Sequence, residues 1–166
     1  EHLPNPLRNQ ALVLADKALD ITELLADKLS LPEPEPARPG SEPSPITYHD
    51  PCHLRKSLHI IEQPRRLIRA NPHYQLREMQ EPERCCGMGG SFNLQHYDIS
   101  RKIGQRKLEA IVASGADTVA TGCPACMMQI ADQLSQSGQS IRIKHAVEIY
   151  AEALQGQESQ ASETAT

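Results

Sequence analysis

The sequence GADTVATGCPAC at residues 115–126 carries the clearest structural signal in this chain. Gly115 suits the end of a helix, because glycine readily adopts the left-handed backbone found just past helix C-termini. Asp117 to Thr121 then read as a short buried strand, and Pro124 suits the first turn of a following helix. A helix, a strand and a second helix in direct succession are typical of α/β domains.

The chain on both sides of this segment continues the same alternation. Helical spacing of apolar residues predicts helices over 98–114, 63–70 and 145–154, and one from Pro124 to about Gly138. Strands are predicted over 46–49, 74–79 and 140–144. We therefore expect residues 46–154 to form an α/β domain with a mainly parallel sheet flanked by helices.

The residues outside this domain have a different composition. Apolar residues recur at helical spacing from Gln10 to Ser30, so residues 1–30 are expected to hold one amphipathic helix. Residues 31–45 are rich in proline and predict a linker, and the polar residues 155–166 predict a disordered tail. Because the chain begins at Glu1, without a methionine, we expect it to be a fragment of a longer protein.

Composition and charge argue against several classes of function. The net charge is −4, and the densest basic patch, Arg65, Arg66 and Arg69, is interpreted as a solvated helix face. With one phenylalanine and no tryptophan there is little aromatic surface for base stacking, so no nucleic-acid partner is expected. No run of about 18 apolar residues is present, so no transmembrane segment is expected.

Five cysteines are the candidate site residues: Cys52, Cys85, Cys86, Cys123 and Cys126. An odd number, with two neighbours in sequence, does not suit a secreted disulfide framework. It favours metal or redox chemistry in a reducing compartment, and hence a cytoplasmic protein. Each group of cysteines follows a predicted strand, so in a parallel sheet all three groups are expected at the same edge.

Each cysteine group has its own chemical signature. Cys123 and Cys126 open a helix, where the macrodipole favours thiolates, the form that binds metal. The side chains of Cys85 and Cys86 diverge, so they fit poorly on one tetrahedral ion and suit a multinuclear cluster. The glycines after them, within residues 87–90, let the backbone approach an inorganic sulfide of such a cluster and donate N–H groups to it.

Other interpretations of these residues remain open. Cys85 and Cys86 also fit a buried pair beside a glycine turn, and Cys123 with Cys126 also fits a thiol–disulfide enzyme. Histidines are alternative ligands in a zinc site, and His53 is the best candidate because it neighbours Cys52. The other histidines considered as ligands are His49, His59 and His96.

The motifs Asp50-Pro-Cys-His53, Cys85-Cys86-Gly87 and Gly122-Cys-Pro-Ala-Cys126 resemble the CCG cysteine-rich domain. That domain occurs in heterodisulfide reductase, in anaerobic glycerol-3-phosphate dehydrogenase, and in the iron–sulfur subunits of lactate and glycolate oxidation systems. Residues 48–54 and 115–124 are most similar to the C-terminal repeat of the lactate and glycolate group. The resemblance covers roughly residues 10–154.

The resemblance implies a cofactor, partners and a location. All five cysteines would be metal ligands, holding a noncubane [4Fe–4S] cluster; a cubane cluster with one spare cysteine, or zinc, are the alternatives. Electrons would pass from a flavoprotein dehydrogenase subunit toward quinone or another acceptor, at the inner face of the membrane. The full-length protein would add a second CCG repeat and a ferredoxin-like segment. No substrate site is evident in the chain itself.

Overall fold

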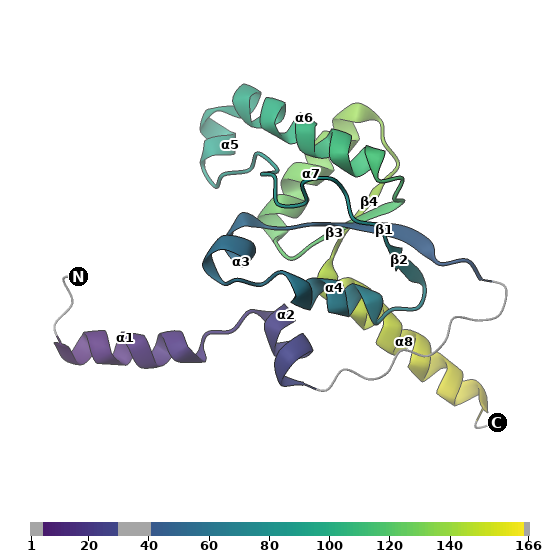
Figure 1. Cartoon of the computed structure of the whole chain (residues 1–166), viewed down its shortest axis with the longest axis horizontal. Helices are drawn as coiled ribbons and strands as arrows, with labels where there is room; N and C mark the ends of the chain where they lie inside the picture. The colour runs from purple at the N-terminus through teal and green to yellow at the C-terminus, as the bar shows by residue number, and fades with distance from the viewer. Residues whose placement is uncertain (1–4, 30–40, 165–166) are drawn as a thin grey trace.

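The computed structural model describes residues 5–29 and 41–164, and its centre is a four-stranded sheet (Figure 1). All strand pairs are parallel, and the strand order is β2-β1-β3-β4. This confirms the prediction of an α/β fold with a parallel sheet. The strands are β1 (Ser44–His49), β2 (Tyr74–Leu76), β3 (Thr118–Thr121) and β4 (Arg142–His145).

Helices cover both faces of the sheet. Helices α6 (Tyr97–Ala113) and α7 (Pro124–Ser137) lie on one face, and α4 (Glu62–Arg69) and α8 (Ala146–Thr164) lie on the other (Figure 1). Alternate residues of β3 serve the two faces, because side chains alternate along a strand. Val119 packs into a core cluster with Ile111 and Ile130, whereas Ala120 packs with Ile46 and Ile149.

The ends of α6 and α7 lie where the sequence predicts them. Gly115, directly after the C-cap Ser114, has φ +67°, and Gly138 caps α7 with φ +68°. Pro124 lies in the first turn of α7, where its missing N–H costs no helical hydrogen bond. The Gly115–Cys126 segment therefore forms a helix end, the central strand β3 and the start of α7.

The N-terminal prediction of one helix over residues 10–30 is wrong. The segment forms α1 (Asn5–Lys17), then α2 (Ile21–Glu23) continued by a π-helical turn η1 (Leu24–Lys28). The break has a local cause: the Asp20 carboxylate accepts a hydrogen bond from the Thr22 N–H at 2.8 Å and caps a new helix. The exposed α1 extends away from the body, whereas α2 and η1 contact α4 (Figure 1).

Several element boundaries differ from the predictions. Residues 31–40 of the predicted linker lie outside the described residues, and its last two residues belong to β1. Helices α3 (Cys52–Ser57) and α5 (Phe92–Gln95) were not predicted, and β2 is shorter than predicted. Helix α8 runs to Thr164 rather than ending at residue 154. Among residues 5–29 and 41–164, no helix is both long and apolar enough to cross a bilayer.

The strand order places a topological switch point between β1 and β3. From β1 the chain moves to β2 on one side, and then returns to β3 and β4 on the other side. In open parallel sheets, ligands bind beyond the carboxyl ends of the strands at such a point. Cys52 follows β1 and Cys123 follows β3, so two of the three cysteine groups lie beside this position.

Candidate metal centre

The cysteines come from three loops and helix starts beyond the sheet. Cys52 is the first residue of α3, and Cys123 is the N-cap of α7, which also carries Cys126. Cys85 and Cys86 lie in the irregular segment between β2 and α5. All five are free thiols; Cys86, Cys123 and Cys126 are buried, whereas Cys52 and Cys85 are exposed.

Four of the thiols form a continuous chain of contacts. The sulfur atoms of Cys86 and Cys126 lie within 4.8 Å of each other. Cys126 is also near enough to Cys123, and Cys86 to Cys85, for each thiol to shift the pKa of its neighbour. Cys52 lies near enough to Cys85 for its charge to raise the pKa of that thiol. The fold thus brings together sulfur atoms from segments that are far apart in sequence, as the strand order predicts.

Interactions among these thiols lower the pKa of two of them and raise the pKa of the other two. The hydrogen bond from the Cys126 thiol, with N–H groups at the start of α7, lowers the pKa of Cys123 to about 5. Hydrogen bonds from Cys126 and Cys85 lower the pKa of Cys86. The donors shift in the opposite sense, because hydrogen bonding to their partners raises the pKa of Cys126 and of Cys85.

Backbone N–H groups also point at the sulfur atoms. The N–H of Gly87 lies 3.3 Å from the Cys85 sulfur, and the N–H of Met88 reaches Cys86. The N–H groups of Ala125 and Cys126 reach the Cys123 sulfur at the start of α7. Such N–H···S contacts stabilise thiolates and are a feature of iron–sulfur sites. The sequence analysis expected the glycine-rich turn to donate N–H groups to an inorganic sulfide, and that contact stays a prediction.

Gly87 is required at its position for steric reasons. Its φ is +97°, and an added Cβ would lie 2.4 Å from the carbonyl oxygen of Ser100 in α6. The Ser100 hydroxyl also donates a hydrogen bond to the Gly87 carbonyl at 2.7 Å. The turn after Cys86 is therefore packed directly against the backbone of α6, which fixes the position of the cysteine.

A buried histidine completes the group. Ligand atoms of His49, Cys86 and Cys126 all lie within 4.8 Å of one another, and all three residues are buried. His49 is the last residue of β1, so its side chain is positioned by the central sheet. The sequence placed His49 among four candidate histidines but favoured His53, which is exposed on α3. A useful signal was its position at the carboxyl end of a strand, at the edge where the cysteines gather.

The loop beside His49 is held by a buried lysine that the sequence did not single out. Lys107 of α6 is 1% exposed and donates hydrogen bonds to the carbonyl oxygens of Glu81 (2.8 Å) and Pro82 (3.0 Å). The same Pro82 oxygen accepts from the Asp50 N–H at 3.0 Å and lies 3.1 Å from the His49 Nδ1. Burial lowers the pKa of Lys107 to about 8.

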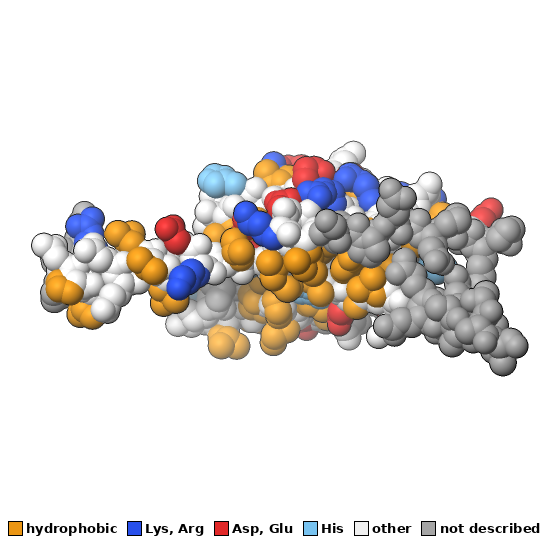
Figure 2. Space-filling model, turned by 90° about the horizontal axis from the view of Figure 1, so that it is seen from below, with side chains coloured by type: hydrophobic (Ala, Val, Ile, Leu, Met, Phe, Trp, Pro, Cys, Tyr) orange, Lys and Arg blue, Asp and Glu red, His pale blue; other side chains and the backbone are white. Residues whose placement is uncertain are grey.

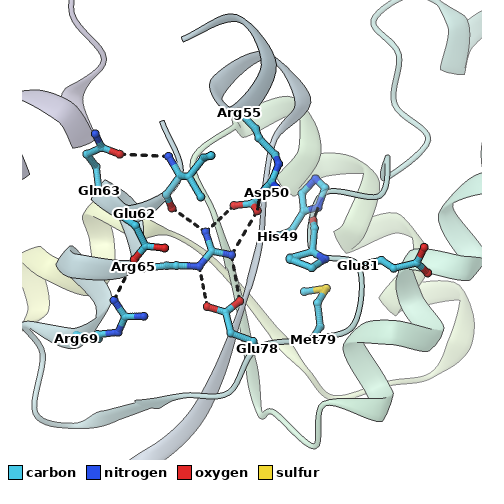
Figure 3. A network of polar contacts seen from close by, with 12 residues as sticks. His49, Asp50, Arg55, Glu62, Gln63, Arg65, Arg69, Glu78, Met79 and Glu81 are labelled. Atoms are coloured by element: carbon cyan, nitrogen blue, oxygen red, sulfur yellow. Dashed lines mark hydrogen bonds and ion pairs between the residues drawn. The ribbon is translucent and has the colours of Figure 1, made fainter. Parts of the chain in front are cut away.

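A buried ion-pair network holds the C-terminal end of β1 on the side away from Lys107 (Figure 3). Arg65 of α4 contacts the Asp50 carboxylate at 2.7 Å and forms two hydrogen bonds with Glu78. Its guanidinium also lies 5.0 Å from the centre of the Tyr48 ring. The interpretation of Arg65 as part of a solvated face is therefore wrong: it is 5% exposed, and it fixes the strand end between His49 and Cys52.

The donor set of this site suits soft or borderline metals. Thiolate sulfur and imidazole nitrogen are the ligands of zinc and of iron–sulfur centres, whereas magnesium and calcium prefer oxygen. Cys86, Cys123 and Cys126 belong to a hydrophobic cluster that includes Met79 and Ile130. The buried part of the site is therefore shielded from water on its inner side, which strengthens the electrostatic interactions there.

Comparison with known proteins places these features in a family. The family model described as CCG, a cysteine-rich domain, matches residues 46–131. One of the subunits of the fumarate reductase (CoM/CoB) of Methanothermobacter marburgensis is 34% identical over 120 residues, which are 72% of this chain and 24% of that protein.

Two bacterial relatives extend this picture. Lactate utilization protein A of Oceanobacillus iheyensis is 28% identical over 139 residues, covering 84% of this chain and 55% of that protein. The probable glycolate oxidase iron–sulfur subunit of Bacillus subtilis is 32% identical over 113 residues, covering 67% and 26%. The chain thus spans between about a quarter and just over half of the length of these curated relatives.

Proposed function

Because this chain belongs to the CCG cysteine-rich domain family, we propose that it holds an iron–sulfur cluster and works as an electron-transfer domain. The proposed ligands are Cys52, Cys85, Cys86, Cys123 and Cys126. The observation that carries the proposal is the contact chain from Cys123 through Cys126 and Cys86 to Cys85, beside the switch point of the sheet.

The chemistry of this donor set supports a cluster. A bound iron–sulfur cluster supplies one-electron transfer, and its potential depends on burial and on hydrogen bonds to sulfur. Here the residues supply both: three of the thiols are buried, and N–H groups of Gly87 and Met88 point at Cys85 and Cys86. Adjacent thiolates such as Cys85 and Cys86 suit a centre with several iron atoms better than a single ion.

The names of the relatives suggest the process that this domain serves. They include a lactate utilization protein and a probable glycolate oxidase iron–sulfur subunit. We propose that the chain relays electrons from a flavoprotein subunit that oxidises a 2-hydroxy acid toward quinone or another acceptor. In this proposal it acts in the cytoplasm, at the inner face of the membrane, beside a second CCG repeat and a ferredoxin-like segment of the full-length protein.

A zinc site is the second candidate, and one observation favours it. The ligand atoms of His49, Cys86 and Cys126 lie within 4.8 Å of one another, which suits one small ion. In that case the site would stabilise the fold or an interface and carry no electrons.

Metal and sulfide analysis separates the two candidates. The whole chain is purified without oxygen, and iron, zinc and acid-labile sulfide are measured together with the EPR spectrum of oxidised and reduced samples. We expect iron and sulfide in similar amounts, and an EPR signal that changes on replacement of Cys86 by serine. Stoichiometric zinc without sulfide would reject the electron-transfer function. A thiol–disulfide enzyme would keep its activity when Cys52 is replaced by alanine, whereas the cluster signal should change.

A further inference from the structure

We propose that His49 is itself a ligand of the metal centre, through its Nε2 atom. This inference rests on the proposed metal site and adds a nitrogen donor to its five cysteines. It starts from the position of the ring, since a His49 nitrogen and the sulfur atoms of Cys86 and Cys126 lie within 4.8 Å of one another.

The hydrogen bond on the opposite side of the ring determines the tautomer of the neutral imidazole. His49 Nδ1 lies 3.1 Å from the Pro82 carbonyl oxygen. A carbonyl oxygen can only accept, so Nδ1 carries the proton and donates it. The neutral ring then has its free lone pair on Nε2. Metal-binding histidines commonly donate their other ring N–H to a carbonyl or carboxylate in this way, which fixes the ring and raises its basicity.

The environment of Nε2 gives the second reason. His49 is 1% exposed, and no N–H or O–H group of the described residues satisfies Nε2; the group within its reach is the Cys86 thiol, itself a proposed ligand. A thiol is only a weak hydrogen-bond donor, so this buried lone pair is poorly satisfied, and poorly satisfied buried polar atoms are rare in native proteins. A metal ion beside Cys86 and Cys126 would satisfy this lone pair.

The groups around the Pro82 carbonyl hold the ring in this orientation. That oxygen is fixed by the buried Lys107 ammonium at 3.0 Å and by the Asp50 N–H at 3.0 Å. Asp50 is fixed in turn by Arg65 (Figure 3). His49 therefore cannot turn away from the sulfur atoms without breaking contacts with a rigid loop. Such preorganisation is typical of metal ligands.

The other histidines in the described part of the chain lack this environment. His53, His59, His73 and His96 are exposed, and His145 is half-buried, with its Nδ1 accepting from the Val147 N–H at 3.3 Å. His53 is the closest competitor, because it lies near enough to Cys123 for its charge to lower the pKa of that thiol. It therefore serves as the control in the experiment.

A neutral nitrogen ligand would change the redox properties of the centre. At a given ligand position a neutral imidazole brings no negative charge, whereas a thiolate brings one and disfavours the reduced state; histidine-ligated [2Fe–2S] centres have higher potentials than all-cysteine ones for this reason. A cysteine at residue 49 would keep a donor atom but add that negative charge. The variant His49→Cys should therefore keep its metal and show a lower reduction potential.

The test is a nitrogen-sensitive EPR measurement on the whole chain, purified without oxygen and reconstituted with ferrous iron and sulfide. Wild-type protein is compared with protein that carries ¹⁵N-labelled histidine, and with the variants His49→Ala and His53→Ala. We expect a strong nitrogen coupling that changes with the label, persists in His53→Ala and is lost in His49→Ala. If His49→Ala does not fold, two results still decide whether His49 is a ligand. These are the change of the nitrogen coupling on histidine labelling of the wild-type protein and the reduction potential of His49→Cys.

Each other result has a definite meaning. A cluster with no strong histidine coupling, or with a coupling that disappears in His53→Ala, would overturn the assignment of His49 and leave the electron-transfer function standing. Zinc in place of a cluster would reject that function. Zinc-edge X-ray absorption would then support His49 if it detects a nitrogen that His49→Ala loses, and would overturn it if only sulfur is seen. Failure to bind any metal would overturn both proposals.

Discussion

Gly87 adopts a left-handed backbone directly after Cys86 and packs on α6, so adding a single methyl group at this residue should strongly destabilise the fold. Gly87→Ala places a Cβ 2.4 Å from the Ser100 oxygen at φ +97°, which should lower the free energy of unfolding by about 3 kcal/mol. Urea unfolding, with metal content measured on the same samples, checks this.

Gly90→Ala is the matched control for this substitution. Gly90 also has a positive φ, +61°, but an added Cβ meets nothing within 4 Å. It should lower stability by only about 1 kcal/mol, the effect of the left-handed backbone alone. Equal effects of the two substitutions would show that contact with α6 is unimportant for the turn.

Arg65 tests the ion-pair network beside the site. Arg65→Met leaves the buried Asp50 with Arg55 as its remaining side-chain partner, so stability should fall by about 3 kcal/mol. On the same helix, Arg69 pairs with Glu62 in an exposed position, and Arg69→Met should change stability by less than about 0.5 kcal/mol. A loss of similar size in both variants, measured by chemical denaturation, would contradict this account.

Lys107 gives the protein a specific pH dependence. Its pKa is lowered from 10.5 to about 8 in the folded state, so between these pH values the unfolded chain binds more protons at this residue. Stability therefore rises with pH across this window, by about 3 kcal/mol in total for this one group. The comparison of wild type with Lys107→Met in denaturant titrations isolates this contribution, because other groups titrate in both proteins.

The exposed Lys102 on the same helix provides the control, since Lys102→Met should follow the wild-type pH profile. If wild type and Lys107→Met differ by a constant amount from pH 8 to 10.5, the lysine is not in the buried state described above.

At the scale of elements, α1 should be dispensable for stability. It buries none of its residues, and Figure 2 shows it extending from the body with hydrophobic side chains on its surface. Deleting residues 1–17 should shift the Tm by less than about 2 °C. Extending the deletion to Lys28 removes the buried Thr22 and Ala26 and should lower the Tm clearly. Thermal unfolding of the three proteins tests both statements, and a large shift with the shorter deletion would be unexpected.

Sequence patterns predicted most elements because local signals and burial agree there. Gly115, Pro124 and Gly138 mark helix ends, and the strand at Asp117–Thr121 was expected within one residue of β3. The break at Asp20 was missed because the apolar spacing continues across it, while one carboxylate hydrogen bond decides the local structure. Helix α3 was missed because its six residues are too few for a periodic apolar pattern to indicate a helix.

The sequence predicted the cysteines of the candidate site but not the residues that surround them. Each cysteine group follows a predicted strand, and in a parallel sheet the carboxyl ends of the strands share one edge, so the sequence sufficed to predict that the groups lie near one another. The sequence could not identify the roles of His49, Arg65 and Lys107. These roles depend on burial and on which carbonyl or carboxylate faces each side chain in the folded state. Periodicity describes which face of an element is apolar, and it does not report such pairings.

At the scale of the whole molecule, a bound metal should act as a cross-link between β1, the segment after β2, and α7. Anything that binds only the native state stabilises it, by about 2.7 kcal/mol when the free ligand is at 100 times its Kd. Removing the metal with a chelator should therefore lower the Tm of the wild-type protein. The Cys86→Ala variant should show little response to the same treatment, and an equal response in both proteins would contradict the assignment.

The wide spacing of the cysteines along the chain has a consequence for biosynthesis. At about 5–20 residues per second, Cys52 leaves the ribosome several seconds before Cys126, and β3 must be made before the two can meet. The nascent polypeptide thus presents unprotected sulfhydryl groups throughout that interval. If the cysteines hold a metal as proposed, its insertion would have to wait until translation has passed α7, and reductants would have to keep these groups unoxidised in the meantime.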